Sequence, residues 1–386
     1  MRVLFLTHSF PRFTGDAPGS FLHRLAFALR DQSVDVHVIA PSAAGLARME
    51  SIDGVPVERF RYAPRSRETL AYTGTMAQDV AGSWGARFAM TGYMAAGLAS
   101  GLRARRQIAP DVIHAHWWFP SGLLAAAVAR LSGTPLITTM HGSDVRLARD
   151  IPVCRPAFRH VMKRSSRVTV VSRWLASEAS AVMPGLDSIV APMPAATERF
   201  TPGGSRHENR FLFVGRLNSQ KGLGHALRAM VHLPGATLDV VGDGPDRESL
   251  GLLATDRGLA ERVVWHGQLT QGEIAEFYRS ATALVVPSTD EGLGLVAAEA
   301  LLCETPVIAF RSGGLPDVVE HERTGLLVQP GDEHGFAAAM QRVLDLPSEA
   351  RTMAKAGRAS ALAAFSPEAV ARRYAGIYRD ATGEKG

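Results

Sequence analysis

Short runs of aliphatic and β-branched residues recur along the chain, separated by segments in which apolar residues repeat every three or four positions. Runs of this length, bounded by glycine, proline or polar residues, predict buried parallel strands, and the longer segments predict amphipathic helices. The predicted strands cover residues 2–6, 34–41, 55–60, 111–116, 136–140, 167–171, 210–214, 237–241, 283–287 and 305–309. Strands that alternate with helices favour an α/β fold.

Helices are expected between these strands and at the end of the chain. A first helix should follow the loop that holds Gly15 and Gly19, because the next apolar residues fall on one face, namely Phe21, Leu22, Leu25, Ala28 and Leu29. Another should begin just after the loop at 288–292 and cover residues 294–302. Further helical segments are predicted over residues 76–106, 332–346, 348–365 and 367–380.

A chain of 386 residues exceeds one typical hydrophobic core, so we expect two domains. Residues 192–204 are rich in proline and glycine and lack periodicity, which predicts an interdomain linker. The first domain would comprise residues 1–194, joined by a C-terminal helix over 367–386, and the second residues 205–366. No apolar run is long enough to span a bilayer, and residues 1–6 form a strand instead of a signal peptide, so we expect a soluble, cytoplasmic protein.

Charge and cysteine content narrow the choice of partners. The net charge of +5 suits anionic substrates or an anionic membrane surface, but without a clustered basic stripe it does not predict nucleic-acid binding. Cys154 and Cys303 lie far apart without metal-ligand spacing, which predicts neither a disulfide nor a zinc site. The apolar residues Phe88, Met90, Tyr93 and Met94 could dock the predicted helix at 76–106 on lipid, or could belong to an ordinary domain helix.

The strongest candidate chemistry lies within residues 285–319. A buried strand leads into a loop with two carboxylates, and a helix that contains Glu299 follows. Glycines let a ligand approach the free N–H groups at such a helix start, which bind anions. A second strand ends at Gly313 and Gly314, so two strand ends present backbone to one crevice. This pattern indicates a nucleotide-sugar site, and the alternative is an ordinary strand-to-helix turn with solvated carboxylates.

Two cations follow the strand at 210–214 on a loop bounded by Gly215 and Gly222. The guanidinium of Arg216 and the ammonium of Lys221 could both reach one diphosphate, because Arg binds phosphate bidentately and Lys acts as a compact point charge. The alternative is that both side chains are merely solvated.

These motifs resemble the donor site of retaining glycosyltransferases of family 4. The resemblance rests on Glu291-Gly292-Leu293-Gly294-Leu295, Glu299-Ala300, Gly313-Gly314-Leu315-Pro316 and Gly215-Arg216-Leu217 with Gln220-Lys221-Gly222. Leu293 and Val296 stand where the family commonly has Phe and Pro. The resemblance implies a GT-B fold, in which two Rossmann-like domains face a central cleft and the second domain holds the donor.

The resemblance also implies roles for residues of the second domain. Glu299 would hold the ribose hydroxyls and Glu291 the donor sugar, while Arg216 and Lys221 would stabilise the leaving diphosphate without a metal ion or other cofactor. The full donor-binding set would be Gly215, Arg216, Lys221, Gly242, Gln268, Leu269, Glu291, Gly294, Leu295, Val296 and Glu299.

In the first domain, His141-Gly142-Ser143-Asp144 resembles the family's His-Gly-x-Asp motif. His141 would act toward the donor sugar, which makes it catalytic with Glu291, Arg216 and Lys221, and Asp144 would fix the loop. On the acceptor side the resemblance implicates Gly19, His116 and Trp117. Alternatively, Gly19 only permits a turn, and the strand with His116 only packs in the core.

The expected function is retaining transfer of a sugar, of the hexosyltransferase type, from a nucleotide diphosphate sugar to a hydroxyl of a glycan, glycolipid or small glycoside. A lipid-linked acceptor would suit peripheral contact with the inner membrane face. Two alternatives are a nucleotide-sugar epimerase of related architecture and a non-catalytic nucleotide-sugar binding protein.

Overall fold

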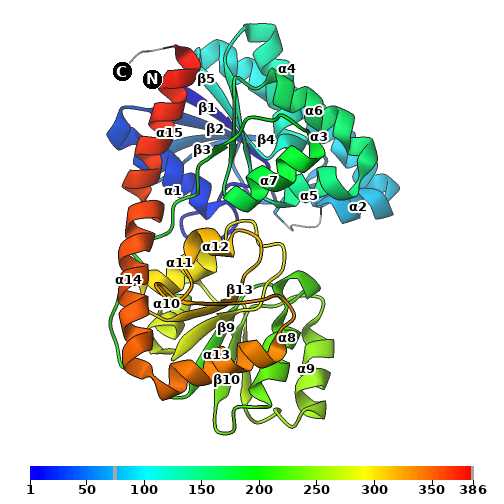
Figure 1. The fold of residues 1–386 in the computed structure, drawn as a ribbon. Helices are drawn as coiled ribbons and strands as arrows, with labels where there is room; N and C mark the ends of the chain where they lie inside the picture. The colour runs from blue at the N-terminus through cyan, green and yellow to red at the C-terminus, as the bar shows by residue number, and fades with distance from the viewer. Residues whose placement is uncertain (73–75, 384–386) are drawn as a thin grey trace. The chain divides into compact units, whose positions relative to one another are not determined.

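The computed structural model describes residues 1–72 and 76–383 and divides the chain into two compact units (Figure 1). Unit 1 comprises Met1–Pro194 and Pro367–Gly386, and unit 2 comprises Ala195–Ser366. Each unit is built on a largely parallel sheet covered by helices, so the predicted α/β class with two parallel-sheet domains is confirmed. Residues 384–386 of the expected C-terminal helix lie outside the described residues.

The sheet of unit 1 has eight strands in the order β3-β4-β2-β1-β5-β6-β7-β8. Its strands are β1 Arg2–Leu6, β2 Asp35–Pro41, β3 Met49–Ile52, β4 Val55–Phe60, β5 Val112–His116, β6 Leu136–Met140, β7 Arg167–Val170 and β8 Ile189–Val190. Only the short strand β3, which was not predicted, pairs antiparallel among the described strands. Asp53 and Gly54 join it to β4 with φ values of 48° and 83°, as a tight hairpin turn requires.

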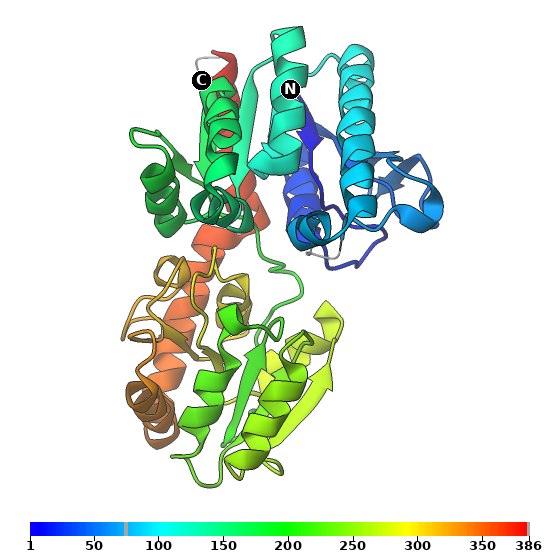
Figure 2. The same cartoon turned by 90° about the vertical axis from the view of Figure 1, so that its right-hand side faces the viewer.

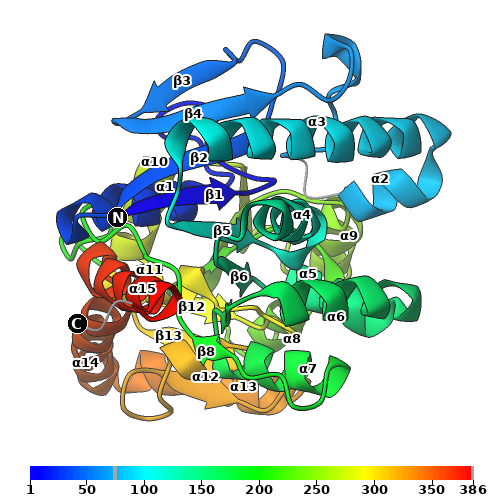
Figure 3. The same cartoon turned by 90° about the horizontal axis from the view of Figure 1, so that it is seen from above.

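Helices cover both faces of this sheet (Figure 3). Helices α1 (Ser20–Leu29) and α15 (Pro367–Thr382) pack together on one face, while α3 (Trp84–Ile108) and α4 (Leu123–Ser132) pack together on the other. The remaining helices are α2 (Met76–Gly82), α5 (Ser143–Asp150), α6 (Arg155–Arg164) and α7 (Arg173–Val182). The single helical segment predicted at 76–106 is wrong, because Ser83 is extended at φ −137° and separates α2 from α3.

The apolar side chains expected to dock α3 on lipid are mostly turned inward. Tyr93 is buried in the unit 1 core, Met90 and Met94 pack against that core, and of the four only Phe88 is well exposed. Contact with a membrane stays a prediction, and it would depend on Phe88 and the exposed Trp84. Cosedimentation with anionic vesicles tests it, and protein that remains in the supernatant would contradict it.

The sheet of unit 2 has six parallel strands in the order β11-β10-β9-β12-β13-β14. They are β9 Arg210–Val214, β10 Thr237–Val241, β11 Val263–Gly267, β12 Ala283–Val286, β13 Val307–Phe310 and β14 Leu326–Val328. The central strands are almost continuously apolar because helices cover both of their faces.

Helices α8 (Leu223–Met230), α9 (Arg247–Asp256) and α13 (Glu333–Asp345) cover one face, and Figure 2 shows α8 and α9 in front of the strands. Helices α11 (Leu295–Leu302) and α14 (Pro347–Phe365) pack together on the other face, near α10 (Gln271–Ser280). The short α12 spans Leu315–Val318. Cys303 caps the C-terminal end of α11, and both cysteines are free.

Candidate functional site

The strand order of unit 2 reverses between β9 and β12. From β9 the chain builds β10 and β11 on one side of the sheet, and then returns to build β12, β13 and β14 on the other. Open parallel sheets bind ligands outside the carboxyl ends of their strands at such a reversal. The loops at this point are residues 215–222 and 287–294, which hold three of the predicted site residues, Arg216, Lys221 and Glu291.

Lys221 and Glu291 form an ion pair across these two loops. The Lys221 Nζ lies 2.5 Å from Glu291 Oε2, and the side chains are 21% and 13% exposed. In a partly buried position each charge needs the other, because an unpaired ion out of water is costly. The sequence suggested both residues but not their contact, since 69 positions lie between them and no local pattern links them.

The backbone of Glu291 is held by the turn after β13. Gly314 N–H donates to the Glu291 carbonyl at 2.7 Å. Gly313 has φ +57°, and a Cβ on it would lie 2.3 Å from the same carbonyl oxygen. Glycine at position 313 is therefore needed to let the turn approach Glu291, a structural reason for this part of the motif that does not require a ligand.

Gln220 fixes the same loop from the other side. The side-chain Nε2 of Gln220 donates to the backbone carbonyl of Asp290 at 2.9 Å, and the backbone carbonyl of Gln220 accepts from the N–H of Thr289 at 2.8 Å. The Asp290 N–H donates to Ser312 Oγ at 3.2 Å, which helps to hold Asp290 at φ 54°. The sequence analysis missed the positioning roles of Gln220 and Ser312, although both stand within or beside the motifs it singled out.

Arg216 lies on the same loop as Lys221 but is exposed. Within the described residues its guanidinium forms no hydrogen bond or ion pair, so it is available to an anionic ligand. Gly242, at φ +128°, packs its backbone against this loop, and a Cβ there would lie 2.0 Å from Gly215 O. Beyond it, Gln268 and Leu269 follow the edge strand β11, whose Gly267 carbonyl accepts from the Gly242 N–H at 2.7 Å.

Helix α11 begins after Gly294, which has φ +89°. Because α11 follows the loop after β12, its first N–H groups lie at the same edge of the sheet. Leu295 and Val296 form its partly exposed start. One turn further, Glu299 accepts a hydrogen bond from the Tyr278 hydroxyl at 3.1 Å. Burial, and then the Glu299 carboxylate, raise the pKa of Tyr278 well above 10. Tyr278 comes from α10, so no pattern around Glu299 could indicate it.

Unit 1 repeats this arrangement, because its strand order reverses between β1 and β5. Three rings from the ends of β1, β5 and β6 pack there at tilted angles: the centroids of His8 and Trp117 lie 4.2 Å apart, as do those of Trp117 and His141. His116 Nδ1 lies 3.2 Å from His141 Nε2. The sequence analysis did not assign a role to His8, although its position just after a strand was a usable signal.

Asp144 fixes the loop that carries His141, as the resemblance implied. Its Oδ1 accepts from the N–H groups of His141 and Gly142, both at 3.0 Å, and its Oδ2 accepts from the N–H of Trp118 at 3.1 Å. One buried carboxylate thus ties the loops after β5 and β6 together. Burial raises the pKa of Asp144, while the three backbone donors oppose that shift.

The residues expected on the acceptor side differ in exposure. His116 is fully buried and contacts His141, so in this conformation a ligand cannot touch it directly, while Trp117 is 8% exposed. Gly19 has φ +72°, and a Cβ there would lie 2.6 Å from Ser9 O, so the turn itself requires glycine. Acceptor binding by Gly19, His116 and Trp117 stays a prediction.

The three clustered histidines His114, His116 and His141 are neutral at pH 7. Burial, followed by the neighbouring histidines, holds the pKa values of His116 and His141 well below 6.5. Burial alone lowers the pKa of His114 to about 3, where the ring contacts the Tyr378 hydroxyl at 2.8 Å and Thr139 Oγ1 at 2.7 Å.

We expect the protein to lose stability as the pH falls below 6.5, because the unfolded chain then binds protons that the folded chain excludes. For His114 alone the loss from pH 7.5 to pH 5.5 is about 1.4 kcal/mol. Urea unfolding at the two pH values measures it. The variant His114→Gln should have a shallower pH dependence of unfolding free energy, and an unchanged dependence would contradict the assignment.

Within residues 1–72 and 76–383, no three His, Cys, Asp or Glu side chains are placed so that they could hold a metal ion together. In the same part of the chain, no helix is long and apolar enough to cross a bilayer.

Two family models match the chain. The "Glycosyl transferase 4-like domain" covers residues 17–190, within unit 1, and "Glycosyl transferases group 1" covers residues 196–360, within unit 2. Together they cover the loops that hold Arg216, Lys221, Glu291 and His141, and they leave out residues 1–16, 191–195 and 361–386.

Two relatives match over most of their length. The chain is 32% identical over 388 residues to the D-inositol 3-phosphate glycosyltransferase of Acidothermus cellulolyticus, covering 89% of this chain and 85% of that protein. It is 29% identical over 367 residues to the 2-deoxystreptamine glucosyltransferase of Streptomyces kanamyceticus, covering 87% and 91%. The solved structure of a sucrose-phosphate synthase from Thermosynechococcus elongatus matches the fold with a TM-score of 0.81 at 24% identity, over 100% of both chains.

Proposed function

The chain belongs to the GT-B glycosyltransferases that combine a 4-like domain with a group 1 domain, and we propose that it transfers a hexose with retention of anomeric configuration. The donor is a nucleotide diphosphate sugar, and the acceptor is a hydroxyl group of a glycan, glycolipid or small glycoside. Unit 2 holds the donor and unit 1 contributes the acceptor-side residues.

The observation that carries the proposal is the set of charges at the strand reversal of unit 2. The exposed Arg216, the Lys221–Glu291 pair and the start of α11 belong to two loops at one edge of one sheet. Two cations and free backbone N–H groups suit a diphosphate, and a carboxylate beside them suits sugar hydroxyls. Glu299, one turn into α11, is the partner for ribose hydroxyls.

In the proposed reaction, the bond between the sugar and the diphosphate breaks, and the departing phosphate accepts the proton of the attacking acceptor hydroxyl on the same face. Arg216, Lys221 and the α11 start stabilise the charge that develops on the diphosphate. Glu291 orients the sugar without forming a covalent bond, since its carboxylate is already engaged by the Lys221 ammonium. His141, neutral at pH 7, contributes as a hydrogen-bonding group and not as a cation.

A thermal-shift screen against UDP-, GDP- and ADP-sugars tests donor binding, because a ligand that binds only the folded state raises its stability by about 2.7 kcal/mol at 100 times its Kd. The donor so identified is then incubated with and without candidate acceptors. Transfer product supports the proposal, an isomerised donor without acceptor would indicate an epimerase, and binding without turnover on any acceptor would indicate a binding protein.

A further inference from the structure

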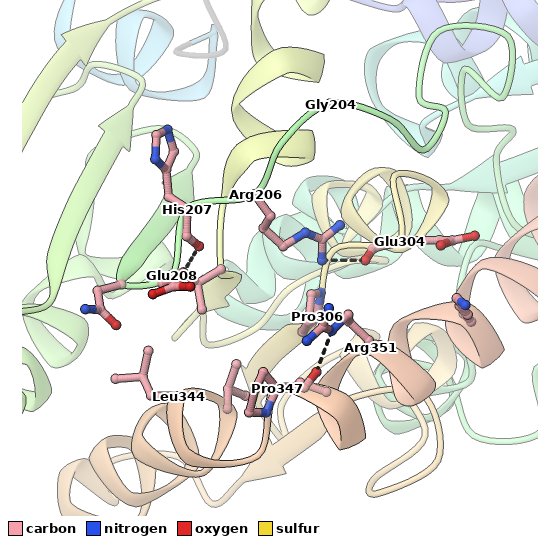
Figure 4. Close-up of a pocket in the computed structure, with 14 residues that line it drawn as sticks. Gly204, Arg206, His207, Glu208, Glu304, Pro306, Leu344, Pro347 and Arg351 are labelled. Atoms are coloured by element: carbon pink, nitrogen blue, oxygen red, sulfur yellow. Dashed lines mark hydrogen bonds between the residues drawn. The ribbon is translucent and has the colours of Figure 1, made fainter.

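Unit 2 contains a cavity of about 630 Å³ that is lined by residues at the amino ends of its strands (Figure 4). Its lining includes Asn209, Thr282 and Pro306, which immediately precede β9, β12 and β13, respectively. Because the strands are parallel, their amino ends share one edge and their carboxyl ends the other. The cavity is therefore separate from the site that holds Lys221 and Glu291.

Three cationic side chains line this cavity: Arg206, Arg351 and Lys355. Within the described residues none of them forms an ion pair with a carboxylate. Arg206 donates to the backbone carbonyl of Glu304 at 2.8 Å, and Arg351 Nε donates to the backbone carbonyl of Pro347 at 3.1 Å. A guanidinium has five N–H donors, so most of the donors in the cavity remain free for a ligand.

Two other arginines of unit 2 are paired with carboxylates. Arg228 pairs with Glu333, and Arg342 pairs with both Glu322 and Glu349. Glu208 and Glu304 also line the cavity, yet neither carboxylate forms an ion pair with its three cations within the described residues. The cavity thus gathers positive charge that the protein itself leaves without direct partners.

The two arginines also act on each other. Burial is the largest cause that lowers the pKa of Arg206; the nearby Glu304 opposes the shift, and the charge of Arg351 adds to it. Figure 4 shows both side chains on the same pocket, Arg206 from the segment that enters unit 2 and Arg351 from α14. An anion placed between them would remove this repulsion and satisfy the free donors.

The volume of the cavity and its apolar lining residues indicate what the ligand carries besides an anionic group. A volume of about 630 Å³ lies in the range of small-molecule sites and is far larger than a phosphate ion needs. Val343, Leu344, Pro347 and Ala350 supply an apolar wall beside the charged groups. The ligand should therefore carry an organic part as well as an anionic group.

We propose that this cavity is a second ligand site, independent of the donor site, that binds a phosphomonoester of a small metabolite such as a sugar phosphate. Arg206, Arg351 and Lys355 hold the phosphate, and the organic part lies against the wall formed by α13 and α14. Bound there, the ligand ties the segment that enters unit 2 to helix α14.

Calorimetry with glucose 6-phosphate as the probe tests this, in the presence of saturating UDP, GDP or ADP so that the donor site is occupied. We expect saturable binding, at least tenfold weaker binding of inorganic phosphate, and none of glucose. The double variant Arg351→Gln/Lys355→Gln changes only exposed side chains, so it should fold normally and lose affinity at least tenfold. The matched control Arg257→Gln removes an exposed guanidinium of unit 2 that does not line the cavity, and it should bind the probe as the wild type does.

Three results would overturn the proposal. The first is no binding of glucose 6-phosphate to the wild-type protein. The second is equal binding by inorganic phosphate, which would reduce the site to a simple anion site. The third is binding that the nucleoside diphosphate displaces or that the double variant retains. Because the probe is measured with the donor site filled, a failure here leaves the proposed transfer reaction untouched.

Discussion

Replacing Lys221 with Met is expected to lower the rate of sugar transfer on the order of 10²-fold, the usual cost of removing one preorganised electrostatic group from a transition state. The ammonium lies on the loop where the diphosphate should leave, and it already holds Glu291 at 2.5 Å. Met keeps an unbranched side chain of similar length and removes the ammonium, with both its charge and its N–H donors. Steady-state kinetics with a saturating donor measures the loss in kcat.

Two further variants distinguish the two roles of Lys221, which are to stabilise charge on the leaving diphosphate and to hold Glu291 in place. Arg216→Gln removes an exposed guanidinium that has no protein partner within the described residues. The loss in transfer rate is expected to be of similar size, and it measures the contact with the diphosphate alone. The double variant Lys221→Met/Glu291→Gln completes a thermodynamic cycle that measures the coupling of the pair. Transfer is also expected to survive EDTA. Near-normal rates in both single variants, or a strict need for magnesium, would contradict the assignment.

The two glutamates should differ in what their loss changes. Glu291→Gln is expected to lower kcat on the order of 10²-fold while the affinity for the free nucleotide is kept, because Glu291 would contact only the sugar. Glu299→Ala is expected to weaken binding of donor and free nucleotide alike by about tenfold, which is the usual cost of losing one charge-assisted hydrogen bond. Calorimetry with the nucleoside diphosphate and kinetics with the full donor measure the two effects.

Tyr278→Phe provides the control for this comparison. It removes the hydroxyl that donates to Glu299 but leaves both carboxylates in place. If Glu299 binds ribose, this variant should show a weaker form of the Glu299→Ala defect and none of the Glu291→Gln defect. The same loss of nucleotide affinity in Glu291→Gln and Glu299→Ala would refute the division of roles.

The sequence predicted local structure well where one physical signal dominated. The strands at 2–6, 136–140 and 237–241 have the predicted bounds, because buried parallel strands are short apolar runs that glycine or polar residues end. It failed at β3, whose half-exposed residues lack a strand pattern, although the Asp53-Gly54 turn signalled the hairpin. It also joined α2 and α3, since Ser83 is not a strong helix breaker by type alone.

The candidate site shows a different limit. Motifs placed Arg216, Lys221 and Glu291 on loops at strand ends, and the strand order brings those loops together. Their partners could not be read locally, because contacts such as Tyr278 with Glu299 join distant segments. Burial was equally hidden: a strand histidine can face a ligand or the core, and His116 faces the core. Glycine motifs were also ambiguous, because a glycine can admit a ligand or another part of the backbone. Gly313 admits the backbone of Glu291.

The central claim is retaining transfer from a nucleotide sugar, and NMR of the first-formed product tests it most directly. The donor and acceptor are mixed in the spectrometer, and the anomeric proton of the new glycoside is followed before any mutarotation or further reaction. The account predicts a glycoside with the same anomeric configuration as the donor. A product of the opposite configuration, or an isomerised donor in place of a glycoside, would contradict it.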